Sequence, residues 1–119
     1  MLQYRNNNFT GIMFNNTVNA SDLGYLHIDA FVPTNSTSIG IQIRDVGGNK
    51  MIETNIFTGF PEGDDKDFRR TLNGFTAGVW KSFDIPLGGN IANQKNNLGA
   101  IIITDGPEFI FDNIYFYKQ

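Results

Sequence analysis

Hydrophobic and polar residues alternate with a period of two along several short stretches of this chain. In Tyr25–Val32 every second residue is aliphatic, beginning with Leu26, and the residues between them are aromatic, polar or charged. Ile39–Asp45 repeats the pattern, with isoleucine at every second position. A period of two is typical of a β-strand that turns one face to the core and the other to solvent. Both stretches are therefore predicted to be strands.

The last quarter of the chain has a different pattern. Ala100–Thr104 and Phe109–Tyr117 are apolar at nearly every position, and Asp105-Gly106-Pro107-Glu108 lies between them. Strands of this kind are typically covered on both faces, and Gly and Pro between two such runs indicate a turn. We therefore expect a β-hairpin in the core, around which the earlier strands pack.

The rest of the chain extends the same picture. Further strands are predicted at Phe9–Phe14, Met51–Phe57, Phe68–Phe75 and Val79–Ile85. The chain contains fifteen Asn and thirteen Gly, which favour turns, and no window has the sustained spacing of an amphipathic helix. The sequence predicts an all-β protein, a β-sandwich jelly roll of about eight to nine antiparallel strands.

The composition argues against several classes of protein and of binding site. A chain of 119 residues predicts a single domain covering residues 1–119, and Met1 is interpreted as the start of a piece taken from a longer protein. The chain has no cysteine, which excludes disulfides and thiolate sites. Its net charge of −3, with acids and bases interspersed, argues against nucleic-acid binding. No apolar run reaches the roughly 18 residues of a membrane span, so membrane insertion is not expected.

The polar sides of two predicted strands supply the first candidate site. If Tyr25–Val32 and Ile39–Asp45 pair with each other, Tyr25, His27, Asp29, Gln42 and Arg44 share one outward face. Carboxylate and guanidinium groups can hydrogen-bond adjacent sugar hydroxyls, and a tyrosine ring can stack on a pyranose. The alternative is an ordinary solvated face with one Asp–Arg pair.

The irregular segment Thr58–Asp67 supplies further candidates, because binding residues are often found on loops. Phe60 is a second candidate ligand contact, and the alternative is that its ring anchors the loop. The acidic residues Asp64, Asp65 and Asp67 could hold Ca²⁺, but they do not have EF-hand spacing and are interpreted as a solvated loop. Trp80, the one tryptophan, is predicted to pack in the core.

Asp112 interrupts the apolar run Phe109–Tyr117. Simple alternation places it on the same strand face as Ile110, Ile114 and Phe116. A carboxylate among apolar side chains needs a hydrogen-bond partner or a cation, so Asp112 is the candidate metal ligand. We do not expect catalysis, because no motif sets two carboxylates across a cleft and no nucleophile or phosphate-binding motif is present.

Three segments together resemble a known family. Tyr25–Pro33, Gly78–Leu87 and Phe109–Lys118, in this order and spacing, resemble the β-jelly-roll carbohydrate-binding modules of secreted polysaccharide-degrading enzymes from Bacteroidetes-type bacteria. Family-16 laminarinases and agarases carry such modules, as do surface glycan-binding proteins. The resemblance covers about Phe9 to Lys118 and implies a galactose-binding-like fold.

The resemblance also implies a function. It implies a non-catalytic carbohydrate-binding module, secreted or at the cell surface of a bacterium, that binds a polysaccharide such as the β-glucan laminarin. It implies covalently linked catalytic or other domains, and a structural Ca²⁺ held with the help of Asp112. The alternative is a spacer domain of the same fold, without a sugar site of its own.

Overall fold

A computed structural model of the chain describes residues 2–5, 9–33, 38–54, 60–104 and 108–118. Within these residues there are eight β-strands and one short 3₁₀ helix, and no helix is long and apolar enough to cross a membrane. The elements are β1 (Leu2–Arg5), β2 (Phe9–Val18), β3 (Tyr25–Phe31), β4 (Ile39–Asp45), β5 (Lys66–Leu72), β6 (Trp80–Pro86), η1 (Gly89–Ile91), β7 (Leu98–Thr104) and β8 (Glu108–Tyr117).

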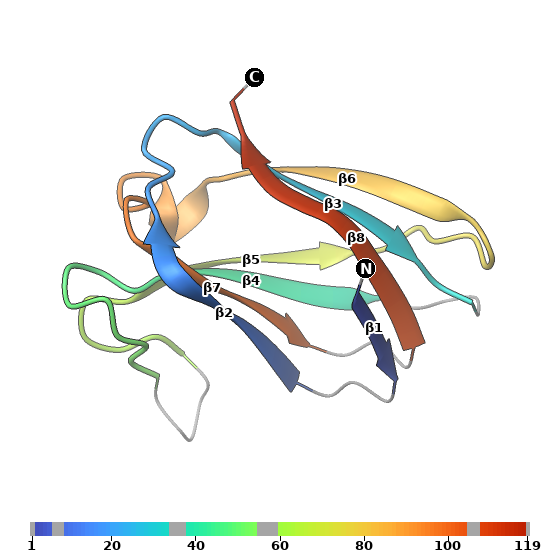
Figure 1. Cartoon of the computed structure of the whole chain (residues 1–119), viewed down its shortest axis with the longest axis horizontal. Helices are drawn as coiled ribbons and strands as arrows, with labels where there is room; N and C mark the ends of the chain where they lie inside the picture. The colour runs from blue at the N-terminus through green and yellow to red at the C-terminus, as the bar shows by residue number, and fades with distance from the viewer. Residues whose placement is uncertain (1, 6–8, 34–37, 55–59, 105–107, 119) are drawn as a thin grey trace.

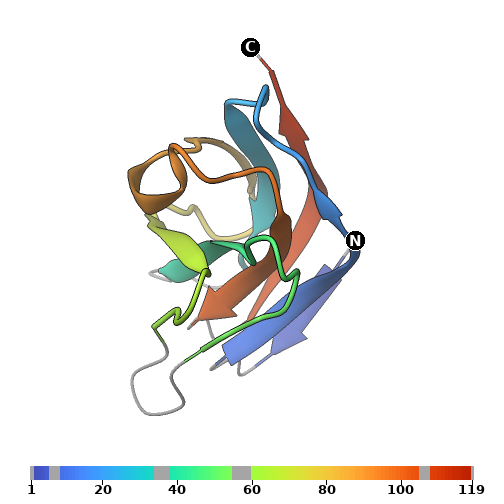
Figure 2. The same cartoon turned by 90° about the vertical axis from the view of Figure 1, so that its left-hand side faces the viewer.

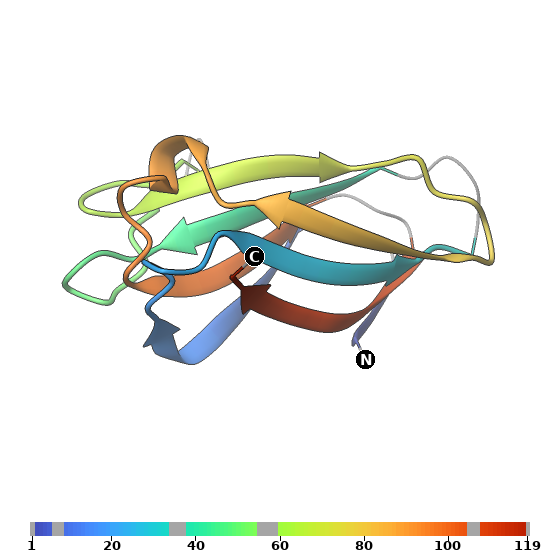
Figure 3. The ribbon, with the colours of Figure 1, turned by 90° about the horizontal axis from the view of Figure 1, so that it is seen from above.

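The strands form two four-stranded antiparallel sheets (Figure 1). The first sheet has the order β1-β8-β3-β6 and the second has the order β2-β7-β4-β5. Consecutive strands alternate between the two sheets except for β4 and β5, which are neighbours in the second sheet, and this is the connectivity of a jelly roll. Seen from above, the strands of both sheets run in nearly the same direction, as in an aligned sandwich (Figure 3). The predicted all-β jelly roll is confirmed.

The core lies between the sheets and follows the period-two patterns of the strands. Leu26, Ile28 and Ala30 of β3 are fully buried, as are the isoleucines of β4. Phe109 and Phe111 of β8 lie 4.9 Å apart between ring centroids and are also fully buried. These side chains form one contiguous cluster with residues of β7. The alternation therefore predicted the inward-facing residues of β3 and β4.

Two predicted strand pairings are wrong. β3 pairs with β6 and β8, whereas β4 pairs with β5 and β7, so β3 and β4 lie in different sheets. Likewise β7 and β8 lie in opposite sheets and do not form a hairpin. The same turn residues can reverse a strand within a sheet or carry it about 10 Å across to the facing sheet, and strand periodicity does not distinguish these cases.

The prediction of a strand at Met51–Phe57 is also wrong for residues 51–54. Residues 51–53 lie outside the strands, and Thr54 forms only an isolated bridge to Pro61. The remainder of that stretch lies outside the described residues. Strand β1 was not predicted from the sequence; it pairs with the Glu108–Phe111 part of β8 at the edge of the first sheet.

Two long connections meet at one end of the sandwich, on the left in Figure 1 and facing the viewer in Figure 2. One joins β4 to β5, and the other joins β6 to β7 and contains η1. Asp45 is fully buried and bonds to both connections. Its carboxylate accepts from the Gly47 N–H at 2.8 Å, the Asn97 N–H at 2.8 Å and the Gln94 amide at 3.0 Å. This end of the fold is therefore closed by a buried carboxylate.

Candidate functional site

The outward side of the first sheet carries a regular grid of side chains from β8, β3 and β6. Strand pairing aligns the outward residues in four rows, and we call this set the outer face. The rows are Tyr117–Tyr25–Pro86, Tyr115–His27–Asp84, Asp112–Asp29–Ser82 and Ile110–Phe31–Trp80. Successive rows lie about 7 Å apart, since they are two residues apart on each strand. The face is therefore aromatic or apolar at both ends and polar in the middle.

Several aromatic rings of the outer face are in contact with one another. Tyr25 stacks on Tyr117 with 5.3 Å between ring centroids, and Tyr115 lies edge-on to Tyr117 at 5.9 Å. Tyr115 also stacks on the His27 ring at 4.8 Å and remains 50% exposed. Stacking fixes the ring planes while one side stays open to solvent. The face therefore presents rings whose planes are fixed by their neighbours.

Trp80 lies at the opposite end of the outer face. Its ring is tilted against Phe31 at 5.5 Å between centroids, and the residue is 44% exposed. The prediction that Trp80 packs in the core is therefore wrong. Within β6 the core positions belong to the alternate residues Phe83 and Ile85, and the period of two places Trp80 on the other side.

His27 lies at the centre of the polar rows. Its Nδ1 is 2.7 Å from Asp84 Oδ1, and its Nε2 is 2.8 Å from Asp29 Oδ1. Both partners are carboxylate oxygens, so both ring nitrogens must carry a proton to make both bonds. The bond to Asp84 is the main cause that raises the pKa of His27 above its ordinary value of 6.5, and Asp29 adds to it. The geometry therefore fits an imidazolium between two carboxylates.

The two carboxylates of this network have further donors. Asp29 accepts from Ser82 Oγ at 2.6 Å and from Asn113 Nδ2 at 2.8 Å. These bonds, led by the one from Ser82, lower the pKa of Asp29. The hydrogen bond from His27, followed by that from Tyr117, lowers the pKa of Asp84, whose Oδ1 is 2.9 Å from the Tyr117 hydroxyl. Both carboxylates are therefore held in the charged form.

Asn113 is placed by a β-bulge in β8. One residue of β3, Ile28, lies opposite two residues of β8, because the pairing steps from Asp29↔Asp112 to His27↔Tyr115. Asn113 occupies the extra position with φ of +51°, a left-handed conformation that asparagine tolerates better than most residues. The bulge aims its amide at Asp29 and turns the next residues of β8 over.

Because of this bulge, the surroundings of Asp112 differ from those predicted. After the extra residue, Ile114 and Phe116 pack against the core, whereas Asp112 is half-buried on the outer face opposite Asp29. Simple alternation had placed all of them on one face, which is wrong. The Asp112 carboxylate accepts from the Asn113 N–H at 3.0 Å. A structural metal at Asp112 stays a prediction.

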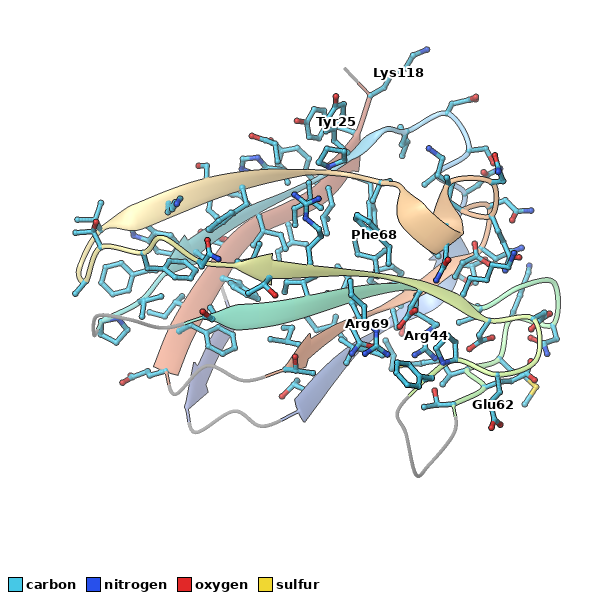
Figure 4. The ribbon with its side chains drawn as sticks, turned by 180° about the vertical axis from the view of Figure 1, so that it is seen from behind. Tyr25, Arg44, Glu62, Phe68, Arg69 and Lys118 are labelled. Carbon is cyan, nitrogen blue, oxygen red and sulfur yellow. The ribbon has the colours of Figure 1, made fainter. Side chains whose placement is uncertain are left out.

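The structure divides the five predicted sugar-binding residues between the two sheets. Tyr25, His27 and Asp29 lie together on the outer face, as predicted. Gln42 and Arg44 lie on β4 in the second sheet, and Figure 4 shows Tyr25 and Arg44 on opposite sides of the molecule. The predicted shared face of all five residues is wrong, because it required β3 and β4 to pair.

Arg44 is also buried rather than solvated. It is 0% exposed and lies under the connection between β4 and β5, where Nη1 donates to Thr54 Oγ1 at 2.8 Å. Asp65 lies 3.5 Å from Nη1 and Asp67 lies 4.0 Å from Nη2. Gln42 is buried as well. Both lie on the side of β4 opposite its core isoleucines, as the alternation predicts, but the predicted exposure of this side is wrong. For Arg44 the reason is the covering connection.

Phe60 lies apart from the outer face. Its ring is 54% exposed, and the Arg69 guanidinium lies 4.6 Å from the ring centroid. It lines a hollow of the surface with Asp67, Phe68 and Arg69 beside β5, in the second sheet. An exposed ring at Phe60 was one of the two alternatives that the sequence left open.

Several residues of the outer face were not predicted from the sequence. Five such residues contact the predicted ones, yet they lie 53 to 92 positions further along the chain: Ser82, Asp84, Asn113, Tyr115 and Tyr117. Period-two alternation in β6 and β8 marks most of them as outward-facing, and this signal was present in the sequence. This signal did not place them beside His27 and Asp29, because the predicted neighbour of β3 was β4 rather than β6 and β8.

Comparison of the chain with protein-family models, with curated proteins and with solved structures found no match.

Proposed function

We propose that the protein is a non-catalytic carbohydrate-binding module whose site is the outer face of the first sheet. The observation that supports this function best is that Tyr115 and Trp80 are exposed on either side of the hydrogen-bonded network around His27. Aromatic rings can stack on the apolar faces of sugar rings, and fixed carboxylates can accept hydrogen bonds from hydroxyls.

The spacing of the rings favours an extended ligand. Tyr115 and Trp80 lie two rows apart, which is about 14 Å along the strands. One monosaccharide is too small to contact both rings, whereas a polysaccharide chain can lie along the rows. Affinity is therefore expected to rise with oligosaccharide length. On an open sheet face each hydrogen bond replaces one to water, with a net gain of about 1 kcal/mol, so affinities in the micromolar to millimolar range are expected.

The family resemblance supplies the first ligand to test and the biological setting. A soluble β-glucan such as laminarin is the proposed polysaccharide. We propose that the protein acts outside a bacterial cell, as one domain of a larger polysaccharide-processing protein. We propose no catalysis, because Asp29 and Asp84 are both bonded to His27 in the same network.

One observation favours the alternative of a spacer domain without a sugar site. The polar groups of the outer face already bond to one another: His27 to both carboxylates, and Asp29 to Ser82 and Asn113. A network that is satisfied internally has less to gain from ligand hydroxyls. In the spacer alternative, the rings and the network only stabilise the sheet.

Affinity electrophoresis against laminarin and other polysaccharides tests the proposal. The parent protein is expected to be retarded by at least one polysaccharide. Tyr115→Ala and Trp80→Ala are each expected to be retarded less, with a Kd for that polysaccharide at least ten times higher. Both side chains are about half exposed, so thermal unfolding should change little.

Phe60→Ala is the matched control, since it removes a similarly exposed ring beside the second sheet. It should bind as the parent does. If Phe60→Ala loses binding while Tyr115→Ala and Trp80→Ala keep it, the outer face is not the site. If the parent protein binds no polysaccharide tested, the spacer alternative is favoured.

A further inference from the structure

Three carboxylates converge in the connection between β4 and β5, on the side of the molecule away from the outer face. One carboxylate oxygen each of Glu53, Asp64 and Asp65 lies within 4.8 Å of the others. Residues 53 and 64–65 come from the two arms of the connection, which are joined by the Thr54–Pro61 bridge and by the Glu62 N–H bond to the Glu53 carbonyl at 2.9 Å. The backbone therefore holds the three side chains together.

Little positive charge compensates this group. Among the described residues, Asp65 is the member with an ion pair, to Arg44 at 3.5 Å. The Glu53 carboxylate accepts a short hydrogen bond from the Asn49 side-chain amide, and Asp64 Oδ2 is 3.4 Å from the Asn49 N–H. These neutral donors do not cancel the repulsion between carboxylates at this separation.

A buried oxygen atom of Asp65 points independently to a missing partner. The Asp65 side chain is 0% exposed. Its Oδ2 accepts from the Glu53 N–H at 2.7 Å and faces Arg44, whereas Oδ1 has no hydrogen-bond partner in the described part of the chain. A buried carboxylate oxygen without a partner is costly, and burial raises the pKa of Asp65. Since Arg44 faces Oδ2, the free Oδ1 remains available to a cation among the three carboxylates.

Two glycines make room for this arrangement. Gly47 and Gly63 both have positive φ, and a Cβ at either would overlap the carboxylate of Asp64 or of Glu53, respectively. The carboxylates therefore lie directly against the backbone, and a larger residue at position 47 or 63 would push them out of the group.

We propose that Glu53, Asp64 and Asp65 bind one divalent cation, and that the cation is Ca²⁺. The donors are all carboxylate oxygens, which hard cations prefer. Three carboxylates, each able to use one or two oxygens, suit the high and flexible coordination number of Ca²⁺ better than the strict octahedron of Mg²⁺, which keeps most of its waters. The ion neutralises the group, satisfies Asp65 and holds the connection over Arg44. This inference does not depend on the proposed function.

The test measures metal binding directly. The purified protein is treated with a chelator, exchanged into chelator-free buffer and titrated with CaCl₂ by calorimetry, with melting temperatures recorded in parallel. We expect one Ca²⁺ per chain and a rise in melting temperature of about 5–10 °C near saturation. MgCl₂ at the same concentration should give a smaller rise.

Variants locate the site. Glu53→Gln and Asp64→Asn change side chains that are not fully buried, so both should fold, and each should weaken Ca²⁺ binding at least tenfold. Glu62→Gln is the matched control, an exposed acid in the same connection (Figure 4), and should bind as the parent does. Asp112→Asn tests the site expected from the sequence. The proposal is overturned if CaCl₂ at 10 mM produces neither heat nor a melting shift, or if Glu53→Gln and Asp64→Asn retain full binding.

Discussion

At the scale of single residues, His27 determines the charge of the outer face. It is the one histidine of the chain, and both of its ring nitrogens contact carboxylate oxygens. With His27 protonated and Asp29 and Asp84 ionised, every hydrogen bond of the network has a donor and an acceptor. Loss of the proton on His27 leaves one nitrogen facing a carboxylate without a hydrogen between them.

The pKa directions set the pH window of this network. The pKa of His27 is raised, so its contribution to stability is fully present below 6.5 and is lost as the pH rises through the raised value. The pKa values of Asp29 and Asp84 are lowered, so their contributions are present above 3.8 and are lost as the pH falls through the lowered values. The complete network therefore exists at mildly acidic pH.

We predict that the His27 ring titrates with a midpoint above 6.5 and that the melting temperature falls as the pH rises through that midpoint. One-dimensional proton NMR reports the titration directly, because no other histidine contributes a signal. His27→Gln should lose this part of the pH dependence. A midpoint at or below 6.5 would show that the two carboxylates do not hold the proton.

At the scale of elements, β4 is the strand that connects the core to the end of the sandwich. Its isoleucines fill the interior, and Arg44 and Asp45 at its end are both fully buried. Beside Asp45 the neighbouring strand β7 has a β-bulge, in which Gly99 is the extra residue and a side chain would overlap Val46. Asp45 accepts hydrogen bonds from both connections at this point. Backbone donors of both connections depend on this one carboxylate.

Asp45→Ala is expected to lower the free energy of unfolding by about 3–5 kcal/mol, because it leaves the Gly47 and Asn97 N–H groups and the Gln94 amide without their acceptor. Chemical denaturation measures the change. Asp45→Asn keeps the shape and one oxygen acceptor, so it should lose clearly less stability. Equal losses in the two variants would mean that packing, rather than hydrogen bonding, determines the role of Asp45.

At the scale of the whole molecule, the sandwich separates the two candidate sites. The outer face belongs to the first sheet, whereas the three carboxylates and Arg44 belong to the second sheet and its connection, with the hydrophobic core between them. Side chains on opposite outer surfaces of two sheets packed about 10 Å apart share no contacts. Changes at one site should therefore act independently of changes at the other.

Arg44→Ala and Tyr115→Ala test this independence. Arg44→Ala should cost about 3–5 kcal/mol of stability, because it leaves buried carboxylates without their guanidinium. Tyr115→Ala should cost much less, and the double variant should show the sum of the two losses within about 0.5 kcal/mol. Chemical denaturation of the four proteins gives the coupling energy. A coupling above 1 kcal/mol would show that the two sheets do not respond separately.

The sequence alone determined most of the stretches that become strands and, where a strand has no bulge, which of its side chains share a face. Alternation placed Leu26, Ile28 and Ala30 in the core and Tyr25, His27 and Asp29 outside, as observed. These properties are local, because successive residues of a strand point to opposite sides whatever lies next to the strand.

Only the tertiary structure decided which strands became neighbours. β3 lies between β6 and β8, so the partners of His27 and Asp29 on these strands come from residues 53 to 88 positions away. Backbone hydrogen bonds are alike for every partner strand, and a connection of a few residues can reach the neighbouring strand or the facing sheet. The burial of Arg44 depends on a connection that covers it. The exchange of inward and outward faces in β8 after Asn113 depends on the bulge opposite Ile28. Neither can be predicted from the alternation of a single strand.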